Sequence, residues 1–320
     1  MKFTIVIPTY NGSAYIEEAL LSAINQTRKA DAVIISDDNS TDNTLDICSR
    51  YKDIVRICKN ENGPSGFVEG WNNAIQLVDE GYIVILHQDD LLAPTFLEEA
   101  EEALTLHPDA KHFFVPCNYV DGEGKIKRTP DYCDGSTRRY SGIEYADAYR
   151  VIGSPHIHRC PGVITHRSIF DVCKYRKEAG HIADDDFFYR VGQYTDVVGV
   201  LKPLASYREH EKSETGHLEN IKLVSRLAND YIYQVEQSAS NYCISKDTYN
   251  YFAYWAAYYT FQEFVYAVSH DDKSLYKLVL LHKDQLKKLR VAISGKQRFV
   301  YGLSKAFGRK VVKVLLKPFV

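Results

Sequence analysis

Short apolar runs separated by amphipathic stretches fill the first third of the chain. Four runs rich in Val and Ile have the length of buried strands, and they cover residues 3–8, 32–36, 54–60 and 82–88. Each is followed by a stretch with apolar residues at helical spacing, over residues 13–26, 40–51, 66–78 and 95–106. In the last of these, Thr95 and Glu98 are spaced as a capping box. Alternating strands and helices predict an α/β fold with a mainly parallel sheet and helices on both faces.

The pattern changes after about residue 211, where long helical stretches rich in Tyr begin. We therefore expect a nucleotide- and catalysis-bearing domain over residues 1–215 and a helical region over residues 216–320. The last piece, residues 299–320, places apolar residues on one helical face and Lys or Arg on the other. A basic amphipathic helix of this kind is typical of a segment that lies on a membrane surface. The open alternative is a helix that docks on the protein and leaves its basic face in water.

Charge is distributed unevenly along the 320 residues, whose net charge is -3. Residues 283–320 carry eleven Lys or Arg and one acidic residue, Asp284, so the remainder of the chain is strongly acidic. A basic tail favours contact with an anionic lipid surface. Nucleic acid is disfavoured as a partner, because the acidic body would repel phosphates.

The location follows from three features of the sequence. The first residues, MKFTIVIPTYN, enter a strand at once and lack the pattern of a signal peptide, and no run of about 18 apolar residues predicts a membrane span. The seven cysteines include no C-x-x-C pair, which favours a reducing compartment and neither a zinc site nor a disulfide framework. We expect a cytoplasmic protein, peripheral on the inner face of the cell membrane through its basic tail.

Polar and acidic side chains follow every one of the four predicted strands. They are Thr9-Tyr10-Asn11, Asp37-Asp38, Asn60-Glu61-Asn62 and Asp89-Asp90. The carboxyl ends of parallel strands meet at one edge of the sheet, where ligands bind in this class of fold. Paired aspartates repel each other and favour a nearby cation. The chain has neither a G-x-G-x-x-G loop after the first strand nor a Walker A lysine. A divalent cation, Mn²⁺ or Mg²⁺, held by Asp90 with Asp89 beside it, is the simplest way to bind substrate phosphates here.

Five segments together resemble the inverting family 2 glycosyltransferases, which have the GT-A fold. The segments are VIPTYN, SDDNSTDNT, HQDDLLAP, ADDDFFYRV and YREHEKS, and the resemblance covers residues 2–216, about two thirds of the chain. Each motif is weak by itself, but their order and spacing are specific. The resemblance implies a Rossmann-like GT-A domain that binds a nucleotide sugar.

The resemblance also implies roles for individual residues. Pro8 and Tyr10 would flank the nucleotide base, and Asp38, with Asp37 beside it, would accept a hydrogen bond from the base. Asp89 would lie toward the ribose or the sugar, Asp90 would ligate the metal, and His210 would lie near the metal and the diphosphate. Asp184 would be the catalytic base. These eight residues form the candidate site.

Some assignments stay open at this stage. Asp184, Asp185 and Asp186 are adjacent, so any of them could be the base, and the cluster could instead serve a helix N-terminus. His156, His158 and His166 could line the acceptor side, although a structural role is favoured. The chain also departs from the family pattern, because it has His87 where many relatives have an acid. Its loop before residue 67 carries no arginine that could reach the donor.

The predicted activity is the transfer of a sugar from a nucleoside diphosphate, UDP or dTDP, to a saccharide hydroxyl. Direct displacement needs one carboxylate base and a metal or cations at the leaving diphosphate. The acceptor would be a saccharide or a lipid-linked glycan in the synthesis of a surface polysaccharide. The alternatives are a catalytically silent sugar- or lipid-binding relative and a nucleotidyltransferase. The second would need a glycine-rich loop that PTYNGS does not supply.

Overall fold

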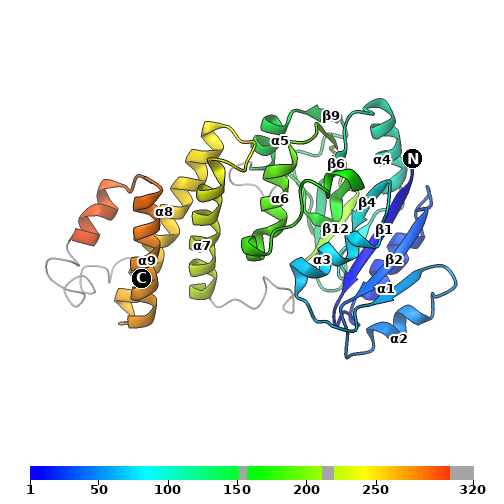
Figure 1. The fold of residues 1–320 in the computed structure, drawn as a ribbon, viewed down its shortest axis with the longest axis horizontal. Helices are drawn as coiled ribbons and strands as arrows, with labels where there is room; N and C mark the ends of the chain where they lie inside the picture. Colours follow the sequence, from blue (N-terminus) through cyan, green and yellow to red (C-terminus); the bar gives the residue numbers. More distant parts are fainter. Residues whose placement is uncertain (151–156, 211–219, 303–320) are drawn as a thin grey trace. The chain divides into compact units, whose positions relative to one another are not determined.

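The computed structural model describes residues 1–150, 157–210 and 220–302. The chain divides into two compact units, Met1–Ser213 and Glu214–Val320. The boundary expected between residues 215 and 216 stays a prediction, because it falls in a segment outside the described residues. Each unit is described by itself below, and Figure 1 labels their helices and strands.

The first unit contains two sheets. The larger has the strand order β3-β2-β1-β4-β10-β6-β11-β9, and the smaller has the order β5-β12-β7-β8. The strands are β1 (Phe3–Thr9), β2 (Ala32–Asp37), β3 (Arg56–Lys59), β4 (Tyr82–Ile85), β5 (Leu91–Leu92), β6 (His112–Phe114), β7 (Cys117–Val120), β8 (Ile126–Arg128), β9 (Thr137–Tyr140), β10 (Val163–His166), β11 (Val197–Val200) and β12 (Ala205–Arg208). The helices are α1 (Ile16–Ile24), α2 (Thr44–Ser49), α3 (Phe67–Gln76), α4 (Phe96–Leu106), α5 (Gly142–Tyr149) and α6 (Ala183–Val191), with 3-10 turns at Cys160–Gly162, Arg167–Ile169 and Lys177–Ile182.

The four strands predicted from the sequence form the parallel part of the larger sheet. β1 pairs in parallel with β2 on one side and with β4 on the other, and β2 pairs in parallel with β3. Figure 1 shows β1, β2 and β4 side by side. The chain reverses its direction of travel across the sheet between β1 and β4. This switch point is where ligands bind in open α/β sheets.

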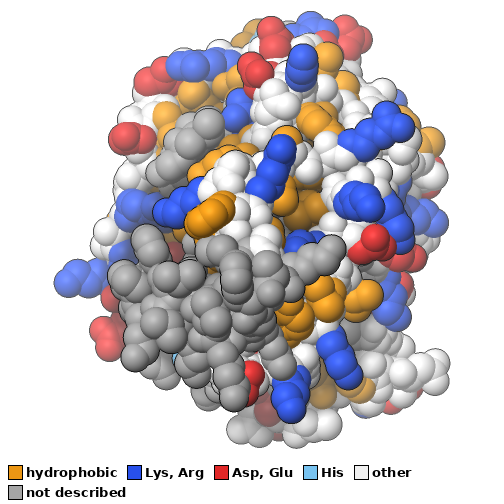
Figure 2. All heavy atoms as spheres, turned by 90° about the vertical axis from the view of Figure 1, so that its left-hand side faces the viewer, with side chains coloured by type: hydrophobic (Ala, Val, Ile, Leu, Met, Phe, Trp, Pro, Cys, Tyr) orange, Lys and Arg blue, Asp and Glu red, His pale blue; other side chains and the backbone are white. Residues whose placement is uncertain are grey.

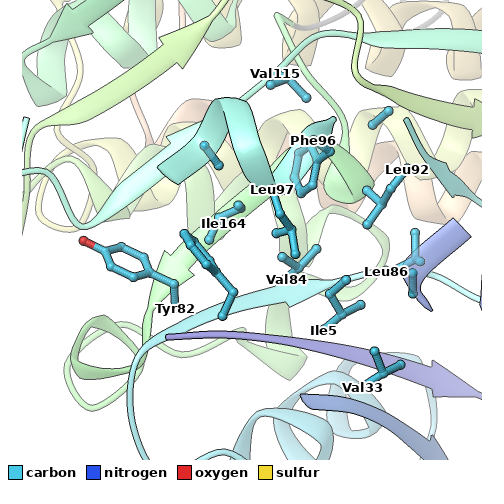
Figure 3. Close-up of a cluster of buried hydrophobic side chains, with 14 of the residues drawn as sticks. Ile5, Val33, Tyr82, Val84, Leu86, Leu92, Phe96, Leu97, Val115 and Ile164 are labelled. Atoms are coloured by element: carbon cyan, nitrogen blue, oxygen red, sulfur yellow. The ribbon is translucent and has the colours of Figure 1, made fainter. Parts of the chain in front are cut away.

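The core lies between this sheet and the helices that cover it. Ile5 and Val84 are completely buried in neighbouring strands, as are Phe96 and Leu97 on α4. Figure 3 shows the two α4 side chains close to Val84 and Ile164 of the sheet. Because both faces of the sheet are covered, the central strands β1 and β4 are buried at nearly every position instead of at alternate ones.

Helix α4 confirms the predicted helix over residues 95–106, but the expected capping box is wrong. Thr95 occupies the N-cap position and its side chain makes no capping hydrogen bond. Glu98 Oε2 instead accepts a hydrogen bond from Thr27 Oγ1 at 2.9 Å. Thr27 lies close enough because its backbone N–H donates to Pro94 O at 2.8 Å. A tertiary contact therefore replaces the local one.

The second unit is helical, as the sequence predicted. Its long helices are α7 (Asn220–Ser238), α8 (Lys246–Ser269) and α9 (Lys273–Lys288). In their interior His282 hydrogen-bonds Glu263 Oε2 at 2.7 Å and Asn229 Oδ1 at 3.0 Å, which joins all three helices. Residues 295–302 are also helical, and Tyr301 packs edge-on against Phe264. The rest of the predicted basic amphipathic helix, residues 303–320, lies outside the described residues.

Candidate active site

At the switch point, a glutamine that follows β4 holds the end of β1 by hydrogen bonds. Gln88 Oε1 accepts hydrogen bonds from Thr9 Oγ1 at 2.6 Å and from the Tyr10 backbone N–H at 2.9 Å. Gly12 lies so close that a Cβ there would come within 2.2 Å of the same oxygen. The two loops therefore form one rigid rim. On this rim Pro8 is half-buried, and the Tyr10 ring is 42% exposed and free to meet a ligand.

Asp37 ends β2 and organises the turn that follows. Its Oδ1 accepts hydrogen bonds from the backbone N–H groups of Asn39 and Ser40, at 3.1 and 3.0 Å. Asn39 has a positive φ of 70° that this turn requires. The other carboxylate oxygen, Oδ2, is buried and has no hydrogen-bond partner in the described part of the protein. Asp37 thus has a structural role, and one of its oxygens remains available to a ligand.

Asp38 holds the loop after β3. Its carboxylate accepts hydrogen bonds from Asn60 Nδ2 at 2.7 Å and from the Ser65 backbone N–H at 2.6 Å. Ser65 Oγ lies 2.9 Å from Asp38 Oδ1. A Cβ at Gly63 would come within 2.5 Å of the Asp38 carbonyl oxygen, so only glycine fits there. Asp38 therefore shapes the loop beside the predicted nucleotide site, and its contact with a base stays a prediction.

Asp90 is almost completely buried at 1% exposure. Its Oδ1 accepts a hydrogen bond from the Arg208 backbone N–H at 2.9 Å, and its Oδ2 is buried and has no hydrogen-bond partner among the described residues. His87 Nδ1 lies 3.6 Å from that oxygen. Burial, reinforced by the negative charge of Asp89, raises the pKa of Asp90 well above its usual value. Burial destabilises the charged form of this carboxyl group, so a bound cation would strongly stabilise that form.

Strand β12 brings a second group of residues to the same place. Arg208, fully buried, donates from Nε to the Asp89 carbonyl oxygen at 2.8 Å and from Nη2 to Glu18 Oε2 at 2.7 Å. His210 Nε2 lies 3.0 Å from Asp89 Oδ2. The structure therefore brings Asp89, Asp90 and His210 together, although the chain separates the pair from the histidine by about 120 residues.

The three acids at the start of α6 have different surroundings. Asp186 is completely buried and accepts two hydrogen bonds from Arg190, at 2.9 and 2.6 Å. Asp185 accepts a hydrogen bond from the Tyr149 hydroxyl. Asp184 is half-buried and accepts from the Asp185 backbone N–H at 2.9 Å, with Cys160 Sγ 3.6 Å from its Oδ2. Burial and then the charge of Asp185 raise the pKa of Asp184, a change that suits a proton acceptor.

One functional candidate escaped the sequence analysis. Arg159 lies close enough to Asp90 and Asp184 for its charge to offset part of the rise that burial causes in the pKa of both carboxyls. Its Nε donates to the Tyr119 hydroxyl at 3.1 Å. Burial opposes the charge of Arg159, but the neighbouring Tyr119, Tyr149 and Asp185 hold its pKa above the usual value. In the sequence, the only sign of this candidate was a basic residue within SPHIHRCPG, a segment singled out for its histidines.

The histidines considered for the acceptor side have structural surroundings. His158 is buried and lies 2.6 Å from the Tyr145 hydroxyl, and His166 packs against Tyr82. His156 is outside the described residues.

A divalent cation fits this site only in part. Among the described residues no three His, Cys, Asp or Glu side chains already form a cation site. The orphaned Asp90 Oδ2 and the Asp89 carboxylate, with its side chain 24% exposed, offer the hard oxygen ligands that Mn²⁺ and Mg²⁺ take. Such ions bind through one or two carboxylates and complete their shell with water and substrate phosphates. The residues present therefore suit a cation that arrives with its phosphate ligand.

The fold and the acidic strand ends define the class of protein. The chain has the GT-A fold and shares it with TarS from Staphylococcus aureus. That match, to residues 1–349 of TarS, has a TM-score of 0.64 at 15% identity and covers 100% of this chain and 92% of the other, so it shows a shared fold. A mannosyltransferase of Pyrobaculum calidifontis, solved in complex with GDP-Man and Mn²⁺, matches with a TM-score of 0.55 at 16% identity. The match covers 83% of the mannosyltransferase chain and 98% of this chain.

The family follows from the sequence comparison. The chain belongs to glycosyl transferase family 2, whose model matches residues 4–171, and the expected family and fold are confirmed. An uncharacterized glycosyltransferase of Rickettsia prowazekii is 33% identical over 66% of this chain and 65% of its own length. The Escherichia coli UDP-Glc:alpha-D-GlcNAc-diphosphoundecaprenol beta-1,3-glucosyltransferase is 34% identical over 44% of this chain and 57% of its own. The matches thus span less than two thirds of these relatives. Asp184 and His210 lie beyond the part that the family model matches.

Proposed function

We propose that the protein is an inverting glycosyltransferase that moves a sugar from a nucleoside diphosphate, UDP or dTDP, to a saccharide hydroxyl. The observation that carries this proposal is a pair of acids on a GT-A fold: Asp90, buried beside Asp89 and His210, and Asp184, half-buried in the first turn of α6. Both occur where burial works against ionisation, and such groups concentrate at functional sites. The nucleotidyltransferase alternative has no glycine-rich phosphate loop to support it. A silent sugar-binding relative would have no use for a half-buried carboxylate, Asp184, whose pKa is raised.

The proposed chemistry is one displacement at the sugar C1. Asp184 accepts the proton of the acceptor hydroxyl, which makes the oxygen nucleophilic as it attacks. The leaving diphosphate departs on the opposite face of the sugar, so the configuration at C1 inverts. Asp90, Asp89 and, through its contact with Asp89, His210 would hold a divalent cation whose charge stabilises the departing diphosphate. Pro8, Tyr10, Asp37 and Asp38 surround the proposed nucleotide position.

The acceptor proposal is a glycan on a lipid carrier. The Escherichia coli relative is named for an acceptor on diphosphoundecaprenol, and a Campylobacter jejuni relative, 27% identical over 40% of this chain, for one on PP-undecaprenol. An enzyme that works on such a substrate must reach a membrane surface. Within the described residues, no helix combines the length and the apolarity that a bilayer crossing requires. We therefore propose peripheral binding on the inner face of the membrane through the basic tail.

A panel of donors tests the proposed function. Thermal unfolding is measured with UDP, dTDP and GDP sugars, each with and without Mn²⁺, because a ligand that binds the folded state raises the melting temperature. We expect a UDP or dTDP sugar to stabilise the protein, more so with Mn²⁺, and to be hydrolysed slowly when no acceptor is present. Protection by no donor on the panel would reject the proposal. Protection without any turnover would favour the silent relative.

Arg159→Gln should slow sugar transfer by at least about 10-fold, because it removes a cation from the reacting centre. Loss of that charge should also raise the pKa of Asp184 further, so the fall of activity on the acid side should move to higher pH. The measurement is a pH–rate profile of the variant against wild type. Arg159→Lys keeps the charge and should restore the acid limb. An unshifted limb in Arg159→Gln would mean that the guanidinium serves only the packing around Tyr119.

Removal of residues 303–320 should release the protein from vesicles that contain phosphatidylglycerol. The cut falls after Gly302 so that Tyr301 keeps its contact with Phe264. Figure 2 shows Lys and Arg side chains spread among exposed hydrophobic ones on one face of the molecule, and Leu281 and Phe299 are 64% and 66% exposed. Co-sedimentation measures binding, with phosphatidylcholine vesicles as the neutral control. Equal binding by the full and the shortened chain would reject residues 303–320 as the membrane contact.

A further inference from the structure

Four aromatic rings form a continuous surface beside the acidic residues. We call Phe67, Trp71, His87 and His181 the aromatic wall. Trp71 stacks on His87 with ring centroids 5.0 Å apart and a 15° angle between planes. Phe67 stacks on His181 at 5.7 Å and 21°, and it meets Trp71 edge-on at 5.3 Å. No ring of the wall belongs to the buried core, since the first three are half-buried and His181 is exposed. The wall therefore offers aromatic surface to a ligand.

Packing within α3 and against Tyr175 holds the rings of the wall in place. Phe67 and Trp71 are four residues apart on α3, so their side chains lie on the same face of the helix. Trp71 also packs edge-on against Tyr175, at 5.2 Å, and Asn72 Nδ2 donates to the Tyr175 carbonyl oxygen at 3.0 Å. These contacts fix α3 to the segment that leads into α6. The position of the rings is thus set without a ligand, which lowers the entropic cost of binding one.

One end of the wall borders both groups of the proposed reaction. At this end His87 Nδ1 lies 3.6 Å from Asp90 Oδ2, where the diphosphate leaves. His87 is also close enough to Asp184, which takes the acceptor proton, for their charges to influence each other. In a single displacement the group between the leaving group and the base is the transferred sugar. A pyranose ring has a face of C–H groups that is apolar, and a flat aromatic ring is a suitable partner for it.

We propose that the aromatic wall binds the pyranosyl ring of the donor through the apolar face of that sugar. This inference rests on the proposed function and deepens it. It assigns a sugar-selecting role to Phe67 and Trp71. Both lie in the segment where the family resemblance predicts an arginine that reaches the donor. The wall contributes contacts that a free nucleoside diphosphate cannot make. The donor should therefore bind more tightly than the diphosphate alone, and this difference should depend on the rings.

The chain offers a built-in reporter for the test. It has only two tryptophans, Trp71 and Trp255, and Trp255 is on α8 in the helical unit. Trp255→Phe leaves Trp71 as the single tryptophan, whose emission can be excited selectively over that of the tyrosines. The probes are matched pairs titrated with Mn²⁺: UDP with UDP-glucose and UDP-N-acetylglucosamine, dTDP with dTDP-rhamnose, and GDP with GDP-mannose. We expect a sugar nucleotide of the best-bound pair to change the Trp71 emission more than its diphosphate does.

Phe67→Leu in this background separates stacking from general apolar contact. It keeps an apolar side chain on α3 but removes the ring, and the affinity for the sugar nucleotide should fall by roughly 3- to 10-fold. The affinity for the matching diphosphate should stay the same. Tyr254→Leu makes a similar change at a ring that is 60% exposed in the helical unit, and it should alter neither affinity.

Each outcome decides the matter. A loss confined to the sugar nucleotide supports the wall. An unchanged preference for the sugar nucleotide in Phe67→Leu overturns the wall and leaves the proposed function intact, as does an equal loss for the diphosphate. If no pair binds the parent protein, the proposed function fails and the wall fails with it. Thermal unfolding of each variant without ligand shows whether the fold is kept.

Discussion

Asp184→Asn should abolish sugar transfer, with a loss of at least about 100-fold, and should leave the protein as stable as before or more so. The amide cannot accept the proton of the acceptor hydroxyl, and a general base contributes a factor of this size. The stability follows from the raised pKa of Asp184. A folded-state pKa above the unfolded value means that stability from this group is present below the unfolded pKa and is lost as the pH rises through the folded one. At neutral pH the ionised carboxylate is a cost, which the neutral amide avoids.

The neighbouring acids provide matched controls. Asp185→Asn removes the same negative charge from the site as Asp184→Asn does, but it keeps the proposed base. It should therefore retain measurable turnover. Asp186→Asn should lower the free energy of unfolding by about 3–5 kcal/mol, because it leaves the buried Arg190 without its ionic partner. Initial rates and thermal melts of the three variants separate the two effects. Wild-type turnover by Asp184→Asn would remove this residue from the mechanism.

Asp90→Asn should weaken Mn²⁺-dependent donor binding by more than about 10-fold and stop transfer. The amide oxygen can still accept the Arg208 backbone N–H, so the fold should survive. What is lost is the charge of Oδ2, the oxygen for which the described part of the chain supplies no hydrogen-bond partner. Because replacing even a supporting group around a metal costs 10- to 100-fold in affinity, replacing a direct ligand should cost at least as much.

Titration of donor with and without Mn²⁺ measures this effect. The matched comparison is wild type in the presence of chelator, which should bind donor as weakly as Asp90→Asn does under either condition. An Asp90→Asn variant that still gains affinity from Mn²⁺ would contradict the assignment. In that case Asp89 and His210, which contact each other at 3.0 Å, become the next residues to test.

The parallel half of the fold was predictable because its signals are local. Apolar runs such as residues 3–8 and 82–88 have strand length, and polar residues directly follow them. The order of connections in βαβ units then places Asp37, Asp38, Asp89 and Asp90 at one edge of the sheet. The antiparallel strands β9 and β10 and the second sheet carry weaker local signals. β8 and β9, for example, have the sequences IKR and TRRY and are mainly exposed, so no apolar run marks them.

The parts of the site that sequence reasoning missed depend on distant contacts. Arg159 and Arg208 are ordinary in sequence, and only the pairing of β12 with β7 and β5 brings Arg208 to Asp90. The same holds for the choice among the three acids of α6. The partners that distinguish them, Arg190 for Asp186 and Tyr149 for Asp185, are visible only after folding. The capping-box prediction was wrong for the same reason, because the Glu98 side chain accepts a hydrogen bond from Thr27 instead.

The close approach of Gly12 to Gln88 restricts how this chain can diverge. Position 12 has no room for a methyl group as long as the amide oxygen of residue 88 holds Thr9 and Tyr10. Substitution at either position alone breaks the bracing between the first and fourth strands. A side chain at position 12 therefore requires the Gln88 amide to move away from Thr9 and Tyr10, so a library that randomises both positions should show that their effects depend on each other.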